Sequence, residues 1–115
     1  MPLCQIVCNT QVESGAEEAF LAAVESGLSK ILGKPTQYIT VTLTRGSVRH
    51  SGSCDPAASV SVHSIGGISS RTNNMICAEV AALCQQHLKV PVDRVFFHFA
   101  DVSAANIGIG SRVFG

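Results

Sequence analysis

The stretch Gly33-Lys34-Pro35-Thr36-Gln37-Tyr38-Ile39-Thr40-Val41-Thr42-Leu43-Thr44 decides the fold, because it ends a helix and begins a strand within a few residues. Gly33 suits the left-handed position that follows a helix, and Pro35 prevents the helix from continuing. The alternating, β-branched residues from 38 to 44 then predict a strand. Upstream, apolar residues recur at helical spacing, at Phe20, Val24, Leu28, Ile31 and Leu32.

The residues before this helix complete a first structural unit. The apolar run from Leu3 to Cys8 predicts a strand. Ser14 and Glu17 have the spacing of a capping box, so we expect Ser14 to be the N-cap of the helix. Strand, helix and strand form a β-α-β unit over about residues 2–45, in which the two strands lie parallel.

A second unit, at about residues 58–101, repeats this order. The alternating residues 58–65 predict one strand, and residues 95–99 predict another. Ser69 or Ser70 can cap the helix between them. The apolar residues of that helix are Ile76, Val80, Leu83, Cys84 and Leu88, and Lys89-Val90-Pro91 ends it.

Two such units predict a single α+β domain over residues 1–115: a four-stranded sheet with both helices on one face. Residues 45–56 are rich in Gly and Ser and predict a loop with a short hairpin. We expect the helix-free face of the sheet to be bare and apolar, and therefore to need a second copy of the chain. The tail, residues 100–115, could add a short strand to that neighbour.

The composition excludes several classes of protein. Eight Lys and Arg balance eight Asp and Glu, so the chain lacks the basic face that would bind nucleic acid or an anionic membrane surface. Hydrophobic residues make up 46% and charged residues 14%, which excludes disorder. No apolar run reaches the roughly 18 residues of a membrane span, so no membrane insertion is expected. The N-terminus lacks the features of a signal peptide.

The five cysteines predict no disulfide framework. None are spaced as Cys-x-x-Cys, and no Cys/His cluster has zinc-finger spacing. The favoured interpretation is small buried residues in a reducing, cytoplasmic compartment, and a metal or redox site is the alternative. The four histidines also lack metal-ligand spacing, so we expect no metal site and interpret His63 and His98 as packing or pocket-lining residues.

Three features could carry chemistry, and each has a simpler interpretation. Pro2 would become a secondary amine, and so a base near neutral pH, if Met1 were removed; otherwise Met-Pro is only a chain start. Lys34 could bind a substrate carboxylate, or could simply complement the helix dipole. The backbone of Ser64-Ile65-Gly66-Gly67 could bind an anion before the second helix, or could be a plain turn.

Taken together, these pieces resemble the macrophage migration inhibitory factor family of the tautomerase superfamily, and the resemblance covers essentially the whole chain. The set of Pro2, Gly33-Lys34-Pro35 and Ser64-Ile65-Gly66 in this order is highly specific. Further matching stretches are Tyr38-Ile39, Asp55-Pro56-Ala57, Val90-Pro91-Val92-Asp93-Arg94-Val95-Phe96, Ala104-Ala105-Asn106-Ile107-Gly108 and Phe114.

The resemblance implies a homotrimer of these protomers, with each active site at a subunit boundary. It implies cofactor-free keto–enol tautomerase activity on small aromatic 2-keto acids such as phenylpyruvate, or on an L-dopachrome ester. Pro2 would be the catalytic base. Lys34 and the Ser64-Ile65 backbone would bind the carboxylate or the enolate. By the same resemblance, Phe96 and His98 would come from the neighbouring subunit, and Tyr38, Ile107 and Phe114 would wall the pocket.

The chain departs from the family pattern at several positions. Many members have Tyr in place of Phe96 and Asn in place of His98, and vertebrate members have an aromatic residue in place of Ile109. We therefore expect aromatic substrates to bind less well than in vertebrate members. Ala57 and Val60 replace the Cys-x-x-Cys of those members, so a thiol–disulfide activity is not expected.

A second function also follows from the resemblance. The chain could be a cytokine mimic or host modulator that binds a cell-surface cytokine receptor, is secreted without a signal peptide, and carries a vestigial pocket. A weaker alternative is decarboxylase or hydratase chemistry, for which the sequence offers no water-positioning residue.

Overall fold

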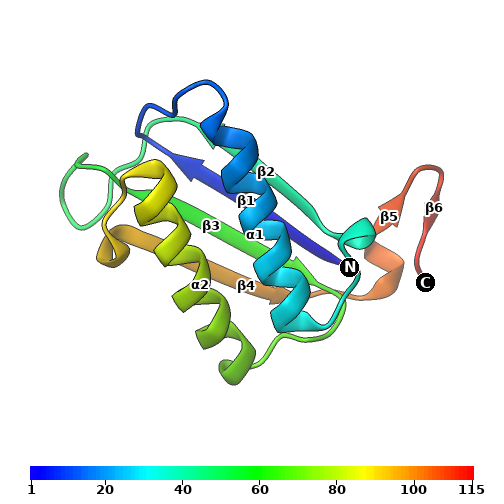
Figure 1. The fold of residues 1–115 in the computed structure, drawn as a ribbon. Helices are drawn as coiled ribbons and strands as arrows, with labels where there is room; N and C mark the ends of the chain where they lie inside the picture. The colour runs from blue at the N-terminus through cyan, green and yellow to red at the C-terminus, as the bar shows by residue number, and fades with distance from the viewer.

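A four-stranded sheet forms one layer of the molecule, and two helices cover one of its faces (Figure 1). The computed structural model describes residues 1–115. The sheet consists of β1 (Pro2–Cys8), β2 (Thr40–Arg45), β3 (Ala58–Ser64) and β4 (Val95–Asp101), and the helices are α1 (Ala16–Leu32) and α2 (Ser70–Leu88). The short 3-10 helices are η1 (Thr36–Tyr38), η2 (Val92–Arg94) and η3 (Ala104–Asn106). This α+β architecture confirms the predicted fold class.

The strand order β2-β1-β3-β4 confirms the two β-α-β units. β1 pairs parallel with β2, β3 pairs parallel with β4, and a helix connects the strands of each pair. The units meet where β1 runs antiparallel to β3, with Pro2 opposite Ser64. Because Ser64 is in turn opposite Asp101 of β4, the start of β1 and the ends of β3 and β4 lie at one end of the sheet.

The hydrophobic core lies between the sheet and the helices. Alternate residues of the two central strands are fully buried, as the predicted alternation requires. The fully buried side chains include Cys4, Ile6, Val60, Val62, Phe20, Val24, Leu28, Ile76, Val80, Cys84 and Leu88. Burying each large apolar side chain contributes about 1.5–3 kcal/mol. The predicted helical stripes are therefore confirmed, with Ile31, Leu32 and Leu83 half-buried at their margins.

The two helices begin differently. The prediction of a Ser14 cap is wrong, because the N-cap of α1 is Gly15, which has a φ of 91° and makes no side-chain capping bond. A left-handed residue here is accessible to glycine, and the helix starts one residue later than a serine cap would allow. In α2 the prediction is confirmed: Ser69 accepts from the backbone N–H of Thr72, and the two residues form a capping box.

The first helix ends as predicted, but the following strand begins later. Gly33 has a φ of 65° and closes α1. Pro35 then leads into η1, so β2 begins at Thr40, whereas the sequence predicted a strand from Tyr38. The shift places the Tyr38 side chain at the end of the sheet, because η1 lies outside the strand ladder.

The helix-free face of the sheet is bare, but the prediction that it is apolar is wrong. Strand alternation places most of the apolar β-branched residues toward the helices, and the other face carries hydroxyl, amide and imidazole groups among a few apolar side chains. The residues on this open face are Leu3, Gln5, Val7, Thr40, Thr42, Thr44, Ser59, Ser61, His63, Phe96, His98 and Ala100.

The remaining segments are short. The predicted hairpin in the 45–56 loop is present as an isolated bridge between His50 and Ser53. In the tail, β5 (Gly108–Ile109) pairs with β6 (Arg112–Val113) of the same chain, and the addition of a tail strand to a neighbour stays a prediction. This hairpin projects from the end of the sheet that holds Pro2 (Figure 1). Neither helix has the length and apolar character needed to cross a membrane.

Candidate functional site

Pro2 is the first residue of the central strand β1 and is fully buried with Met1 in place. The ladder on both sides fixes this end of the strand, with Ser64 opposite Pro2 in β3 and Thr40 opposite Leu3 in β2. Burial, followed by the positive charge and a hydrogen bond of Lys34, lowers the pKa of the Met1 amino group below its ordinary value of 8.0. The amino end of the chain therefore lies beside Lys34 in surroundings that favour a neutral amine.

Lys34 is held immediately after the end of α1. Its backbone N–H donates to the Ser29 carbonyl at 3.2 Å, and the Ser29 hydroxyl donates to the Lys34 carbonyl at 2.6 Å. With its backbone fixed in this way, the half-buried side chain reaches across to the turn after β3. There its Nζ donates to the carbonyl oxygen of Ile65 at 3.0 Å.

The turn after β3 presents one free backbone donor. The carbonyl of Ser64 accepts from Val102 N–H at 2.9 Å, and Gly66 N–H donates to Asp101 Oδ1 at 3.0 Å. Between them, the N–H of Ile65 has no acceptor within the chain. Peptide groups alternate in direction along a strand, so this N–H faces the β1 side, where Pro2 begins. A carboxylate or an enolate oxygen could accept from it.

The Ser64 hydroxyl is a second unpaired group at this end of the sheet. Ser64 is the one fully buried polar residue of the core, and its Oγ has no hydrogen-bond partner. Strand alternation turns this side chain toward the helices, together with Val60 and Val62. The turn therefore offers its backbone, and not this hydroxyl, to the solvent side.

Three predicted wall residues gather on the chain segments next to Pro2. Tyr38 and Phe114 meet edge to face, with ring centroids 6.1 Å apart at 82°. Ile107 is buried, and its carbonyl accepts from Phe114 N–H at 2.9 Å. The tail thus returns to η1 and places these three apolar side chains at one end of the sheet.

Phe96 and His98 do not join this group within one chain. Phe96 is opposite Ser59, about 16 Å along β3 from Ser64 at about 3.3 Å per residue. Its side chain is 58% exposed and lies 6.3 Å from the His50 ring. The ring of His98 lies 6.3 Å from that of His63 on the open face of the sheet.

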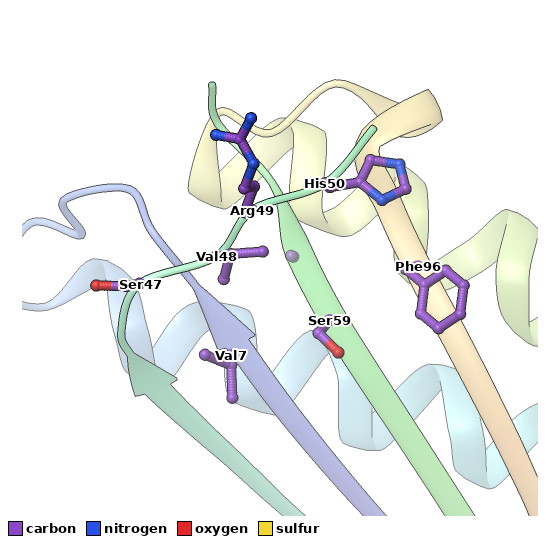
Figure 2. Close-up of a pocket in the computed structure, with 8 residues that line it drawn as sticks. Val7, Ser47, Val48, Arg49, His50, Ser59 and Phe96 are labelled. Atoms are coloured by element: carbon purple, nitrogen blue, oxygen red, sulfur yellow. The ribbon is translucent and has the colours of Figure 1, made fainter. Parts of the chain in front are cut away.

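The largest cavity of the chain is also separate from Pro2. Figure 2 shows it at the opposite end of the sheet, beneath the 47–50 loop, with His50 beside Phe96. Its volume is about 550 Å³, and its lining is Val7, Ser47, Val48, Arg49, His50, Ala58, Ser59 and Phe96. We place the candidate site at Pro2 because the amino end of the chain, a cation and a free N–H donor meet there, although the largest cavity lies elsewhere.

Asp101 is a site residue that the sequence analysis missed. Its carboxylate fixes Gly66 from the end of β4, which the sequence predicted to end at Phe99. The signal that could have identified it is a carboxylate just after an apolar strand that pairs with the strand before the Gly66-Gly67 turn. Nowhere in the chain do three or more His, Cys, Asp or Glu side chains come together as a metal site would require.

Comparisons with known proteins agree with one another. The family model described as "Macrophage migration inhibitory factor (MIF)" matches residues 1–115. The macrophage migration inhibitory factor of Meriones unguiculatus is 34% identical over 116 residues, with 99% of each chain covered. The solved structure of the Toxoplasma gondii factor has a TM-score of 0.94 and 37% identity, covering 97% of this chain and 99% of that chain. A homologue from Prochlorococcus marinus has a TM-score of 0.92 and 29% identity, covering 98% and 99%.

Proposed function

Because this chain belongs to the macrophage migration inhibitory factor family, we propose that it is a keto–enol tautomerase that needs no cofactor and uses Pro2 as its general base. Removal of Met1 would give Pro2 a free secondary amine at the start of β1. The proposed substrates are small aromatic 2-keto acids such as phenylpyruvate, with an L-dopachrome ester as a related substrate. The observation that carries the proposal is the convergence of the amino end of the chain, Lys34 and the free Ile65 N–H.

The proposed base acts as a neutral amine. The surroundings that lower the pKa of the Met1 amino group, burial first and Lys34 second, would act on the Pro2 amine in the same way. A neutral Pro2 nitrogen takes a proton from the carbon next to the ketone. The resulting ammonium then donates a proton to the enolate oxygen, which leaves the enol and regenerates the base.

The negative charge of the substrate carboxylate meets groups that are already in place. The Lys34 ammonium has three donors, so it can keep its bond to the Ile65 carbonyl and still bind a substrate oxygen. The Ile65 N–H supplies a second donor from the backbone. Donors that are held in place before the substrate binds can bind its carboxylate without reorganising during the reaction.

We further propose that the active assembly is a homotrimer in which a neighbouring subunit brings Phe96 and His98 to each Pro2. Two observations support this proposal. Within one chain both side chains are exposed, and their partners in β3, Ser59 and Ser61, lie before the end of the strand that is opposite Pro2. The open face of the sheet is uncovered, as an assembly surface would be in an isolated protomer.

The test is phenylpyruvate ketonisation, followed by ultraviolet absorbance, with three purified forms. These are the protein with free Pro2, the Pro2→Gly variant, and a form with an uncleaved N-terminal extension. We expect turnover with free Pro2 and a fall of about 10²–10⁴-fold in the extended form, which has no free amine at this position, the typical contribution of a general base. Pro2→Gly keeps a primary amine, so its activity should fall but remain above that of the extended form. Equal turnover in all three forms would refute the role of Pro2.

A matched control separates this chemistry from assembly. Leu3→Ala alters the next residue of β1 but leaves the Pro2 amine in place, so it should retain most of the activity. The oligomeric state of every form is measured by analytical ultracentrifugation. Loss of activity in Pro2→Gly with an unchanged assembly assigns the effect to the base.

A second candidate function is cytokine-like activity. The observation that favours it is the full-length match to a rodent protein whose name describes an effect on macrophage migration. We propose release without a signal peptide, from the cytoplasm, followed by binding to a cell-surface receptor. Receptor binding that persists in Pro2→Gly would separate this role from catalysis, and no binding by the assembled protein would exclude it.

A further inference from the structure

Two opposite charges hold a single peptide group beside Pro2. The carbonyl of the Ile65–Gly66 peptide accepts from Lys34 Nζ at 3.0 Å, and the N–H of the same peptide donates to Asp101 Oδ1 at 3.0 Å. The ammonium comes from the end of α1 and the carboxylate from the end of β4. One peptide plane thus connects three elements that are distant in the sequence.

The peptide needs this support because its own backbone is loosely restrained. Gly66 and Gly67 have φ values of 74° and 79°, and glycine has the widest choice of alternative conformations. A cation on the carbonyl and an anion on the N–H both align with the peptide dipole. Hydrogen bonds to charged groups are about twice as strong as neutral ones, and bonds in such a chain polarise one another.

The neighbouring peptide carries the donor that faces the site. Ile65 N–H has no acceptor in the chain, and it is separated from the held peptide only by the backbone bonds of Ile65. The Ser64–Ile65 peptide, which carries this donor, is held on its carbonyl side by Val102 N–H, and the fixed Ile65–Gly66 plane restrains it from the other side. The same peptide also holds the Lys34 side chain, because the Lys34 ammonium donates to the Ile65 carbonyl oxygen.

We infer that Asp101 is a positioning residue, which holds the Ile65–Gly66 peptide so that Lys34 and the Ile65 N–H converge on a substrate carboxylate. This inference rests on the proposed tautomerase function and specifies how the site recognises its substrate. Asp101 acts through Gly66 and does not touch the reacting atoms. Its loss should therefore weaken carboxylate binding more than it slows proton transfer.

The kinetic test compares phenylpyruvate with its methyl ester, which lacks the carboxylate. For Asp101→Ala we expect KM for phenylpyruvate to rise about tenfold, the effect of one hydrogen bond to a charged group, with kcat within about threefold. KM for the ester should stay within about twofold. Asp101→Asn keeps an accepting oxygen and should recover most of the loss. Asp93→Ala removes an exposed carboxylate that makes no hydrogen bond and serves as the matched control.

Two kinetic results would contradict the positioning role of Asp101. An equal rise in KM for acid and ester, or an Asp101→Ala variant indistinguishable from Asp93→Ala, would overturn the inference. Circular dichroism checks that every variant is folded. If Asp101→Ala does not fold, the comparison is made with Asp101→Asn.

A hydrogen-exchange experiment tests, without catalysis, whether Asp101 holds the Ile65–Gly66 peptide. By nuclear magnetic resonance, the Gly66 N–H should exchange faster in Asp101→Ala than in the unmodified protein, and unchanged exchange would overturn the inference. If the free-Pro2 protein does not turn over phenylpyruvate, the proposed function fails. The dissociation constant of phenylpyruvate, measured by titration of the Ile65 amide signal, then replaces KM: a weaker affinity in Asp101→Ala supports the positioning role, and an equal affinity refutes it.

Discussion

Replacing Ser64 with alanine should stabilise the fold, because the serine hydroxyl is buried without a partner. An unsatisfied buried polar group costs about 1–3 kcal/mol, and removing it recovers that cost. The small void left by the oxygen loses some dispersion contacts, which reduces the gain. We therefore expect the free energy of unfolding to rise by about 1 kcal/mol. With an unfolding entropy of about 2.1 cal/mol/K per residue, this corresponds to an increase in Tm of about 4 °C.

The assay is thermal unfolding by circular dichroism at one fixed protomer concentration, because assembly makes Tm depend on concentration. Ser59→Ala is the matched control, since Ser59 lies in the same strand with an exposed side chain. Its effect should be within about 0.5 kcal/mol. The kcat/KM of Ser64→Ala for phenylpyruvate should stay within about threefold, because the proposed substrate contacts come from the backbone of the turn.

A lower Tm for Ser64→Ala would refute this reasoning, since it would mean that the hydroxyl has a partner in the folded protein. The register identifies the group to examine, because Pro2 is directly opposite Ser64. Measuring forms with and without Met1 would decide the matter. Destabilisation only in the form with free Pro2 would identify the proline amine as that partner.

The remaining predictions concern the amine and the cysteines. The kcat/KM for phenylpyruvate should rise with pH and level off above a midpoint that lies below the ordinary pKa of a proline amine, because the burial and the Lys34 charge that lower the pKa of the Met1 amino group would also favour a neutral Pro2 amine. Lys34→Ala should move this midpoint upward only part of the way, since burial remains; an unchanged midpoint in the pH–rate profile would contradict the role of the charge. A thiol reagent at pH 8 should label the exposed Cys54 first, because burial raises the pKa of Cys4 and Cys84 to about 12. Equal labelling of Cys4 and Cys54 by mass spectrometry in the folded protein would show that β1 opens readily.

The order of elements could be predicted because local chemistry decides it. Gly33 and Pro35 end one helix and Pro91 follows the other, whatever the rest of the chain does. Alternation along β1 and β3 identified the buried residues in the same way. Pro2, Lys34 and the Ser64-Ile65 turn were identified by motif, and the ladder then brought them to one end of the sheet.

The missed features depend on partners that are distant in the sequence or on backbone angles. Asp101 reaches the Gly66 N–H only because β4 continues to pair with β3 as far as Ser64, and no local sequence pattern specifies this register. Gly15 replaced Ser14 as the cap through a left-handed φ that composition does not encode. The polar character of the open face follows from which alternate residues point away from the helices, among them Thr40, Thr42 and Thr44, and their hydroxyl groups suit contact with water.

The antiparallel pairing of β1 with β3 also gives the sheet an approximate internal dyad. Pro2 is opposite Ser64 at one end, and Ala58 is opposite Cys8 at the other, so the first residue of β3 is the counterpart of Pro2. Ala58 lines the 550 Å³ cavity of Figure 2, so the counterpart of the Pro2 position lies beside that cavity. Its nitrogen belongs to an internal amide, whose lone pair is delocalised and does not accept a proton near neutral pH. A duplicated architecture can repeat the start of a strand, but a polypeptide has one N-terminus, so each protomer can supply one amine base.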